Sequence, residues 1–160
     1  MCGIAGVFSF KPLKEKETKE LAKKLLLEIE ERGEDATGIS VIDTKTNRVD
    51  FYKKPEKASL FVQDEAINAF FKGSFNVVLL HTRAKTSGEA SNNQNNHPIY
   101  DKIMNSILIH NGMIWNYKEI KEIYKLPMDG EVDSEVILKL YGYFVSLAEE
   151  KPIVKALNLL

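Results

Sequence analysis

Short apolar runs alternate along the chain with segments whose apolar side chains recur at helical spacing, and this alternation predicts a mixed α and β fold. Residues 2–10 are small, β-branched and aromatic, which is typical of a buried strand, and Pro12 follows them. Between residues 14 and 31 apolar side chains recur three and four positions apart among lysines and glutamates, which predicts an amphipathic helix. Gly33 is placed to end that helix.

The middle of the chain predicts a hairpin, a helix and a central strand. Residues 38–43 and 48–53 carry apolar or aromatic side chains on either side of a turn at Asn47. A helix is expected over residues 59–72. Residues 76–81 then contain a short continuous apolar run over 77–80, which is typical of a central strand.

The second half contains a polar loop, a strand and two helices. Residues 87–97 are rich in Asn and Ser and make a loop long enough to suggest a functional role. Residues 106–110 predict a strand, and a long amphipathic helix is expected from residue 132 onward. There are no repeats and no linker. Because no parallel βαβ pattern stands out, the elements alone indicate only mixed α and β structure.

A shorter helix is expected to begin at Asn116. Its side chain is placed to cap the helix, and Glu119 follows three residues later. Trp115 and Ile120 have the spacing of a hydrophobic staple, which predicts that these two side chains pack together.

The length of 160 residues fits one folded domain over residues 1–160, with no room for a second catalytic domain. The hydrophobic content of 44% and the charged content of 28% are ordinary for a soluble globular protein. Lys and Arg number 22 against 23 Asp and Glu, and neither sign gathers in a long tail. This balance argues against nucleic acid or a membrane surface as partner.

The chain also lacks the marks of membrane insertion and export. No apolar run approaches the roughly 18 residues of a membrane span, and the N-terminus does not resemble a secretion signal. Because the chain has one cysteine, it cannot form an intrachain disulfide. We therefore expect a cytoplasmic protein.

The single cysteine, Cys2, stands directly behind the initiator methionine and opens the string Cys-Gly-Ile-Ala-Gly. Methionine is generally removed before small second residues, and its removal would give Cys2 a free α-amine. An α-amine has a pKa of about 7.7 to 8.0 and a thiol about 8.5, so the amine can accept the thiol proton near neutral pH. Nucleophile and base would then share one residue. The alternative is a small buried residue at the start of a strand, which is the commoner role of a free cysteine.

Two further motifs combine charged side chains with glycines or with the end of a strand. Residues 32–38 (RGEDATG) hold an arginine and an aspartate between glycines, a pattern that a helix stop and a turn would also produce. Residues 81–88 (HTRAKTSG) place Arg83 and Thr86 just beyond a buried strand. A loop in that position can present a guanidinium and a hydroxyl to a ligand carboxylate. The alternative is a surface arginine.

Asn111, Gly112 and Asp133 are candidates for contacts with a polar ligand. The side-chain amide of Asn111 and the backbone N–H of Gly112 could converge on one point, as an oxyanion hole requires. Asn-Gly is also the commonest tight-turn dipeptide.

Asp133 starts the last long helix, where an aspartate is most often an N-cap. A carboxylate there can equally receive a ligand ammonium.

The three histidines do not have the spacing of a metal site. His81, His97 and His110, taken with Cys2, show neither an i, i+4 pair nor a CxxC pair. We expect packed or loop-orienting histidines and no metal. A glycine-rich phosphate loop is also missing from the sequence, so we expect no cofactor.

The five motifs, in this order, resemble the class II glutamine amidotransferase domain, an N-terminal-nucleophile hydrolase. They are Cys-Gly-Ile-Ala-Gly, Arg-Gly-x-Asp-x-x-Gly, His-Thr-Arg-x-x-Thr, His-Asn-Gly-x-Ile-x-Asn-Tyr and Asp-Ser-Glu-Val-Ile. The match is closest to the branch found in glucosamine-6-phosphate synthase and amidophosphoribosyltransferase. The resemblance implies an α+β fold, an αββα sandwich of two antiparallel sheets between helix layers. Because the chain ends at Leu160, where the family usually continues into further strands, we expect a fold that is either incomplete or C-terminally abbreviated.

The resemblance also implies roles for the residues around the substrate. Cys2, freed of Met1, would be the thiol nucleophile, with its own amine as the base. Arg83, with help from Thr86, would hold the α-carboxylate of glutamine, and Asp133 would hold its α-ammonium.

The remaining implied roles concern the reaction itself. Asn111 and Gly112 would stabilise the oxyanion, Arg32 would lie beside the nucleophile, and His97 would lie on a loop bordering the pocket. Thiolate attack would release ammonia, and water would then hydrolyse the thioester to glutamate. Loss of one oxyanion donor would lower the rate by about a hundredfold to a thousandfold.

Three positions depart from the family pattern. Ala84 stands where an aromatic residue often follows the arginine, Ser87 replaces a histidine, and Glu34 replaces the usual proline. The first two put the shape of the carboxylate-binding loop in question.

The leading hypothesis is a glutaminase subunit or domain that releases ammonia for a separate synthase. One alternative is an N-terminal-cysteine amidase acting on another amide, although Arg83 and Asp133 form a pair suited to a free amino acid. A second alternative is a glutamine sensor or assembly module that binds without turnover, which retention of Met1 would favour.

Overall fold

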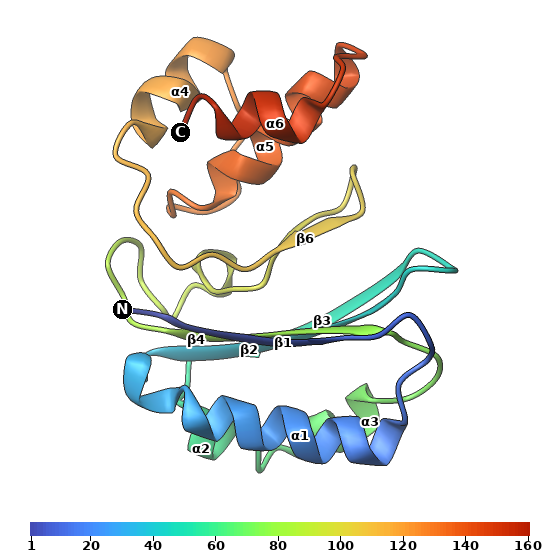
Figure 1. The fold of residues 1–160 in the computed structure, drawn as a ribbon. Coiled ribbons are helices and arrows are strands. Elements are labelled where there is room, and N and C mark those ends of the chain that lie inside the picture. The colour runs from blue at the N-terminus through green and yellow to red at the C-terminus, as the bar shows by residue number, and fades with distance from the viewer.

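The computed structural model describes residues 1–160 and arranges them in four layers, in the order helices, sheet, sheet, helices (Figure 1). The strands are β1 (Gly3–Phe8), β2 (Ala36–Asp43), β3 (Arg48–Lys54), β4 (Val77–Arg83), β5 (Ile99–Asp101) and β6 (Ser106–Leu108). The α-helices are α1 (Glu15–Glu28), α2 (Ala58–Phe61), α3 (Glu65–Phe70), α4 (Tyr117–Tyr124), α5 (Glu135–Ser146) and α6 (Pro152–Leu157). Two 3-10 helices are η1 (Glu30–Arg32) and η2 (Asn93–Asn95). The predicted α+β sandwich of two antiparallel sheets between helix layers is confirmed.

The larger sheet has the strand order β1-β4-β2-β3, and every neighbouring pair is antiparallel. One of its faces packs against α1, α2 and α3 (Figure 1). Side chains alternate between the two faces of a strand, so every second residue of β2 and β4 enters this core. The buried members of the core are Ala22, Leu26, Ile39, Val41, Ala58, Phe61, Ile67, Phe71, Phe75, Val78 and Leu80.

The opposite face of this sheet carries polar residues into the space between the two halves. Ile4, His81, Gly38 and Lys53 stand side by side across the four strands. A Cβ on Gly38 would lie 2.0 Å from the carbonyl oxygen of His97. Gly38 therefore lets the loop that precedes β5 approach the sheet closely.

The second half has its own core and is built on the β5–β6 hairpin and the last three helices. Helix α5 contacts α6 and both strands of the hairpin. The buried members are Ile114, Ile120, Leu126, Val136, Ile137, Leu140, Phe144 and Ala156. In neither half does a helix combine the length and apolar character that crossing a bilayer requires.

Three local predictions were wrong. The helix expected over residues 59–72 is broken into α2 and α3, because the side chain of Asp64 accepts a hydrogen bond from the N–H of Ala66 and starts a new helix there. Trp115 does not form a staple with Ile120, since its side chain is 85% exposed. Asn116 precedes α4 as expected, but its side chain donates to the carbonyl oxygen of Leu159 instead of capping the helix.

Candidate active site

Cys2 lies just ahead of β1, where its thiol and its backbone meet two different loops. The thiol sulfur is 3.6 Å from the carbonyl oxygen of Ala84, to which it can donate. The Nε of Arg32, in η1, donates to the carbonyl oxygen of Cys2 at 3.2 Å. A Cβ on Gly3 would lie 2.5 Å from the hydroxyl of Thr82, so only glycine lets the chain run this close to β4. The first three sequence motifs therefore meet at Cys2.

The Arg-Gly-x-Asp motif braces the loop that follows β4. A Cβ on Gly33 would lie 2.3 Å from the carbonyl carbon of Arg83, so the two backbones touch. The N–H of Asp35 donates to the carbonyl oxygen of Arg83 at 2.9 Å. The carboxylate of Asp35 accepts from the N–H of Lys85 at 2.7 Å. The motif thus does more than stop a helix, because it fixes the backbone on both sides of Ala84.

Arg83 is buried at the end of β4, with 3% of its surface exposed. One terminal nitrogen donates to the side-chain oxygen of Asn96 at 2.8 Å. The other donates to the carbonyl oxygens of Ser87 and Gly88, the latter at 2.9 Å. A guanidinium has five N–H donors. The N–H of Nε and one on the first terminal nitrogen make no bond to the protein.

Negative groups gather around this guanidinium. Burial lowers the pKa of Arg83, and the charges of Cys2, Asp35, Glu89 and Asp133 act in the opposite direction.

The residues that depart from the family pattern contribute through their backbones. Ala84 offers its carbonyl oxygen to the thiol of Cys2, and Ser87 offers its carbonyl oxygen to Arg83. A change of side chain leaves both oxygens in place. The departures therefore do not remove the contacts that shape this loop.

Asp133 holds the turn that contains Asn111 and Gly112. Its buried carboxylate accepts a hydrogen bond from the N–H of Ile114 at 2.7 Å. The N-cap of α5 is Ser134, the next residue, whose side chain makes no capping bond. Asn111 and Gly112 are both exposed and make no hydrogen bond to the protein, so their N–H groups are free to bind a ligand.

A cavity of about 290 Å³ opens between the loop after β4 and the segment that leads into α4. Its lining residues are Thr86, Ser87, Met113, Ile114, Trp115, Tyr117, Lys118 and Asp133. Thr86 and Asp133, two of the residues expected to bind substrate, therefore line the same cavity. Cys2, Arg83, Asn111 and Gly112 are not among the lining residues, although Gly112 directly precedes Met113.

His97 does not line this cavity. It is 5% exposed, and its ring stacks on that of His81 with 4.3 Å between the centroids. Burial lowers the pKa of His81 to about 4 and the pKa of His97 well below its ordinary value. Both imidazoles are therefore neutral at physiological pH. No group of three or more His, Cys, Asp or Glu side chains is placed to hold a metal ion.

Comparison with known proteins gives the family. A family model described as "Glutamine amidotransferase domain" matches residues 64–146. The whole chain is also 35% identical to 26% of the length of glutamine–fructose-6-phosphate aminotransferase (isomerizing) from Staphylococcus aureus strain N315. The protein of that name from Staphylococcus epidermidis strain ATCC 12228 matches to the same extent. The chain belongs to the glutamine amidotransferase domain family. It spans about a quarter of the length of these curated relatives.

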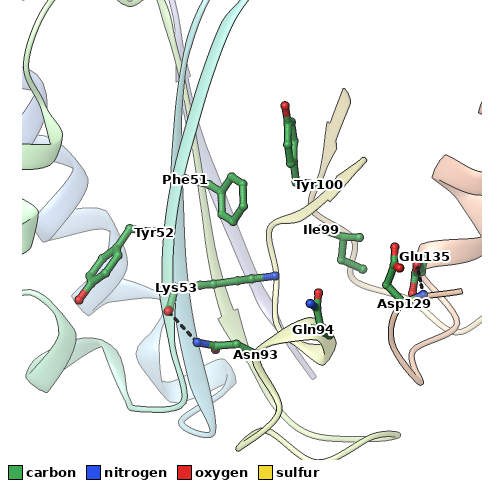
Figure 2. A pocket seen from close by; sticks show the side chains of 9 residues that line it. All are labelled: Phe51, Tyr52, Lys53, Asn93, Gln94, Ile99, Tyr100, Asp129 and Glu135. Atoms are coloured by element: carbon green, nitrogen blue, oxygen red, sulfur yellow. Dashed lines mark hydrogen bonds between the residues drawn. The ribbon is translucent and has the colours of Figure 1, made fainter. Parts of the chain in front are cut away.

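A second cavity in this amidotransferase domain, of about 340 Å³, contains none of the predicted site residues (Figure 2). It lies between β3 and the start of β5, with Glu135 and Asp129 across from Lys53. The Nζ of Lys53 donates to the carbonyl oxygens of Asn96 and Pro98 at 2.6 and 2.8 Å. Lys53 therefore supports the loop around His97.

Asn95 and Asn96 are site-supporting residues that the sequence reasoning did not identify. Asn95 is fully buried and bonds to Glu131 through both its amide nitrogen and its oxygen. Asn96 accepts from Arg83 and donates to the carbonyl oxygen of Ala90 at 2.6 Å. The cluster of asparagines in a long loop was the available signal, because Asn side chains readily bond to nearby backbone.

Proposed function

We propose that this domain hydrolyses the side-chain amide of glutamine through a thioester on Cys2. The observation that carries the proposal is the contact of the Cys2 thiol with the backbone of Ala84, at 3.6 Å. Ala84 directly follows Arg83 and stands two residues before Thr86, which lines the cavity together with Asp133. The nucleophile therefore adjoins the residues proposed to recognise substrate.

The base in this proposal is the α-amine of Cys2 after Met1 is removed. Met1 is 83% exposed, which leaves its peptide bond open to an aminopeptidase. The freed amine would have a pKa near that of the thiol, about 8, and could take its proton without help from another side chain. Arg32 supports this arrangement because it holds the Cys2 carbonyl and so fixes the nucleophilic residue.

Recognition in this proposal uses two opposite charges. Asp133 lines the cavity and would receive the α-ammonium. Arg83 supplies the positive charge for the α-carboxylate and has two N–H groups without a protein acceptor, while Thr86 adds a hydroxyl. His97 would act indirectly, through the loop that it shares with Asn96. A site with both charges favours a free amino acid over a peptide amide.

The chemistry would proceed in two steps. The thiolate attacks the amide carbon, and the developing oxyanion accepts hydrogen bonds from the side-chain amide of Asn111 and the N–H of Gly112. The terminal amine returns its proton to the leaving nitrogen, so ammonia departs and a thioester remains. Water, deprotonated by the same amine, then attacks the thioester and releases glutamate and the thiol.

We further propose that the ammonia passes to a synthase domain or subunit. The relatives are named as aminotransferases acting on fructose 6-phosphate, and the chain matches 26% of their length. Amino transfer needs a nitrogen source, which hydrolysis of glutamine supplies. The expected cytoplasmic location stays a prediction.

The proposal is tested by replacing the nucleophile. Cys2→Ala should lower ammonia release from glutamine by at least about a thousandfold, while glutamine binding, measured by calorimetry, persists. Ser9→Ala, one residue beyond the end of β1, is a matched control that should keep full activity. Undiminished turnover in Cys2→Ala contradicts the nucleophile assignment, and wild-type protein that binds glutamine without turnover favours a sensor.

A further inference from the structure

Three hydrogen bonds hold the turn from residue 110 to residue 114, which contains the proposed oxyanion donors. The Nε2 of His81 bonds to the carbonyl oxygen of His110 at 3.1 Å. The Nδ1 of His110 bonds to the hydroxyl of Ser134 at 2.9 Å. The third is the bond from Ile114 to Asp133 already described. All three connect the turn either to β4 or to the residues just before α5.

His81 must be the donor in the first of these bonds, because a carbonyl oxygen can only accept. Its proton therefore sits on Nε2, and its Nδ1 is buried without a partner. The ring is fully buried, lies on β4 two residues before Arg83, and stacks on His97. A rigid strand and a stacked neighbour thus hold the donor in one orientation.

His110 supports the turn from the other side. A Cβ on Gly112 would lie 2.6 Å from its Nε2, so the imidazole packs against the Gly112 backbone. The bond from its Nδ1 to Ser134 anchors the ring beside Asp133. The backbone of residue 110 is thus tied to β4, while its side chain is tied to the start of α5.

We propose that His81 and His110 are positioning residues for the oxyanion donors of the proposed glutaminase. This inference rests on the proposed function. Asn111 and Gly112 make no bonds to the protein, so their orientation depends on the residue before them. Oxyanion stabilisation works best when the donors are fixed before charge develops. Hydrogen bonds that hold the neighbouring residues in place keep such a site in its productive geometry. The same two histidines link this turn to the segments that carry Arg83 and Asp133.

The test separates positioning from folding by using two substitutions at one residue. His81→Leu removes the donor and should lower kcat about 10- to 100-fold, with KM for glutamine changed less than about threefold. Alkylation of Cys2 by iodoacetamide, which does not use the oxyanion donors, should keep its wild-type rate. His81→Gln, whose amide nitrogen can take the place of Nε2, should restore most of kcat.

A milder pair of variants covers the case in which His81→Leu does not fold. Ser134→Ala removes the partner of the His110 ring and should lower kcat about 3- to 10-fold. Ser146→Ala makes the same change at the other end of α5, where the hydroxyl donates only to the carbonyl oxygen of Tyr143, and should leave kcat unchanged. Equal kcat in Ser134→Ala and Ser146→Ala overturns the proposal.

The remaining outcomes are also decisive. If kcat and the alkylation rate of His81→Leu fall together and His81→Gln does not recover, the histidine acts only on folding and the inference is wrong. If the wild-type protein releases no ammonia after removal of Met1, the proposed function fails first. An active wild type with fully active His81→Leu leaves the glutaminase standing and removes only the positioning role.

Discussion

The carboxylate of Asp35 accepts a hydrogen bond from the backbone N–H of Lys85 at 2.7 Å, on the far side of Ala84 from Arg83. The backbone N–H of Asp35 donates to the carbonyl oxygen of Arg83 at 2.9 Å. One residue therefore clamps the segment whose central carbonyl meets the thiol of Cys2. Two motifs that lie some fifty residues apart in the chain are one structural unit.

Loss of the Asp35 carboxylate should loosen this unit. We expect Asp35→Ala to raise KM for glutamine about tenfold and to lower the free energy of unfolding by about 1 to 2 kcal/mol, because the N–H of Lys85 loses its acceptor. Asp43→Ala is the matched control, since Asp43 accepts from the N–H of Lys45 at the far end of β2. It should lower stability without changing KM. Steady-state kinetics measure KM, and urea unfolding measures the free energy of unfolding. An unchanged KM in Asp35→Ala rules out the clamp.

Replacing Arg83 by lysine should affect substrate binding and the loop together. A lysine keeps the charge but cannot reach Asn96, Ser87 and Gly88 at once as the guanidinium does. We expect KM to rise at least about tenfold. Arg48→Lys is the control, because Arg48 also donates to two backbone carbonyl oxygens but lies in the β2–β3 hairpin. If both variants show the same KM as wild type, Arg83 does not contact the substrate.

The fold was largely predictable because local periodicity determines the longer elements. Residues 38–43 and 48–53 lie in paired strands, and the run 77–80 lies in β4 (Val77–Arg83), an inner strand of the larger sheet. The strand β5 (Ile99–Asp101) was missed, since its two apolar residues directly follow Pro98 and the polar loop and make no apolar run like that in residues 106–110. The predicted packing of Trp115 against Ile120 was wrong, because sequence spacing does not determine the direction in which an aromatic side chain points from a loop.

The site was predictable only in part. The sequence identified the loops, because their charged residues and glycines stand directly after strands. It could not reveal that Arg83 is enclosed by Asn96 and two carbonyl oxygens, or that His81 stacks on His97. Those contacts join residues on separate elements, and no local pattern records which side chains will meet.

Gly33 should tolerate no side chain. A Cβ there would lie 2.3 Å from the Arg83 backbone, which cannot move aside as a flexible side chain can. We expect Gly33→Ala to lower the free energy of unfolding by about 2 kcal/mol or more. Gly142→Ala, in the interior of α5, meets only the side chain of Met104 at 3.3 Å and should be neutral or stabilising. Thermal unfolding compares the two, and equal melting temperatures contradict the close approach.

The buried histidines should make the protein sensitive to mild acid. The pKa of His81 is lowered to about 4 from its ordinary 6.5. The unfolded chain therefore binds more protons than the folded protein between these values, and stability falls as pH drops from 6.5 toward 4. The free energy of unfolding is unaffected by protonation of His81 above about pH 7. It falls by about 3 kcal/mol as the pH drops through the range from 6.5 to 4.

Urea unfolding at several pH values between about 4 and 7 checks this expectation. In His81→Gln the group that titrates is absent, so stability should decline less steeply over the same range. An equal decline in wild type and His81→Gln means that other groups cause the acid sensitivity.

Intact mass and glutamine turnover, measured on the same sample of protein purified from cells, test whether the terminal amine of Cys2 serves as the base. We expect a mass without Met1 together with release of glutamate and ammonia, so that the active protein has Cys2 as its N-terminal residue. A sample that retains Met1 and still turns over glutamine would contradict the role of the terminal amine. A sample that lacks Met1 and releases no ammonia would contradict the glutaminase itself.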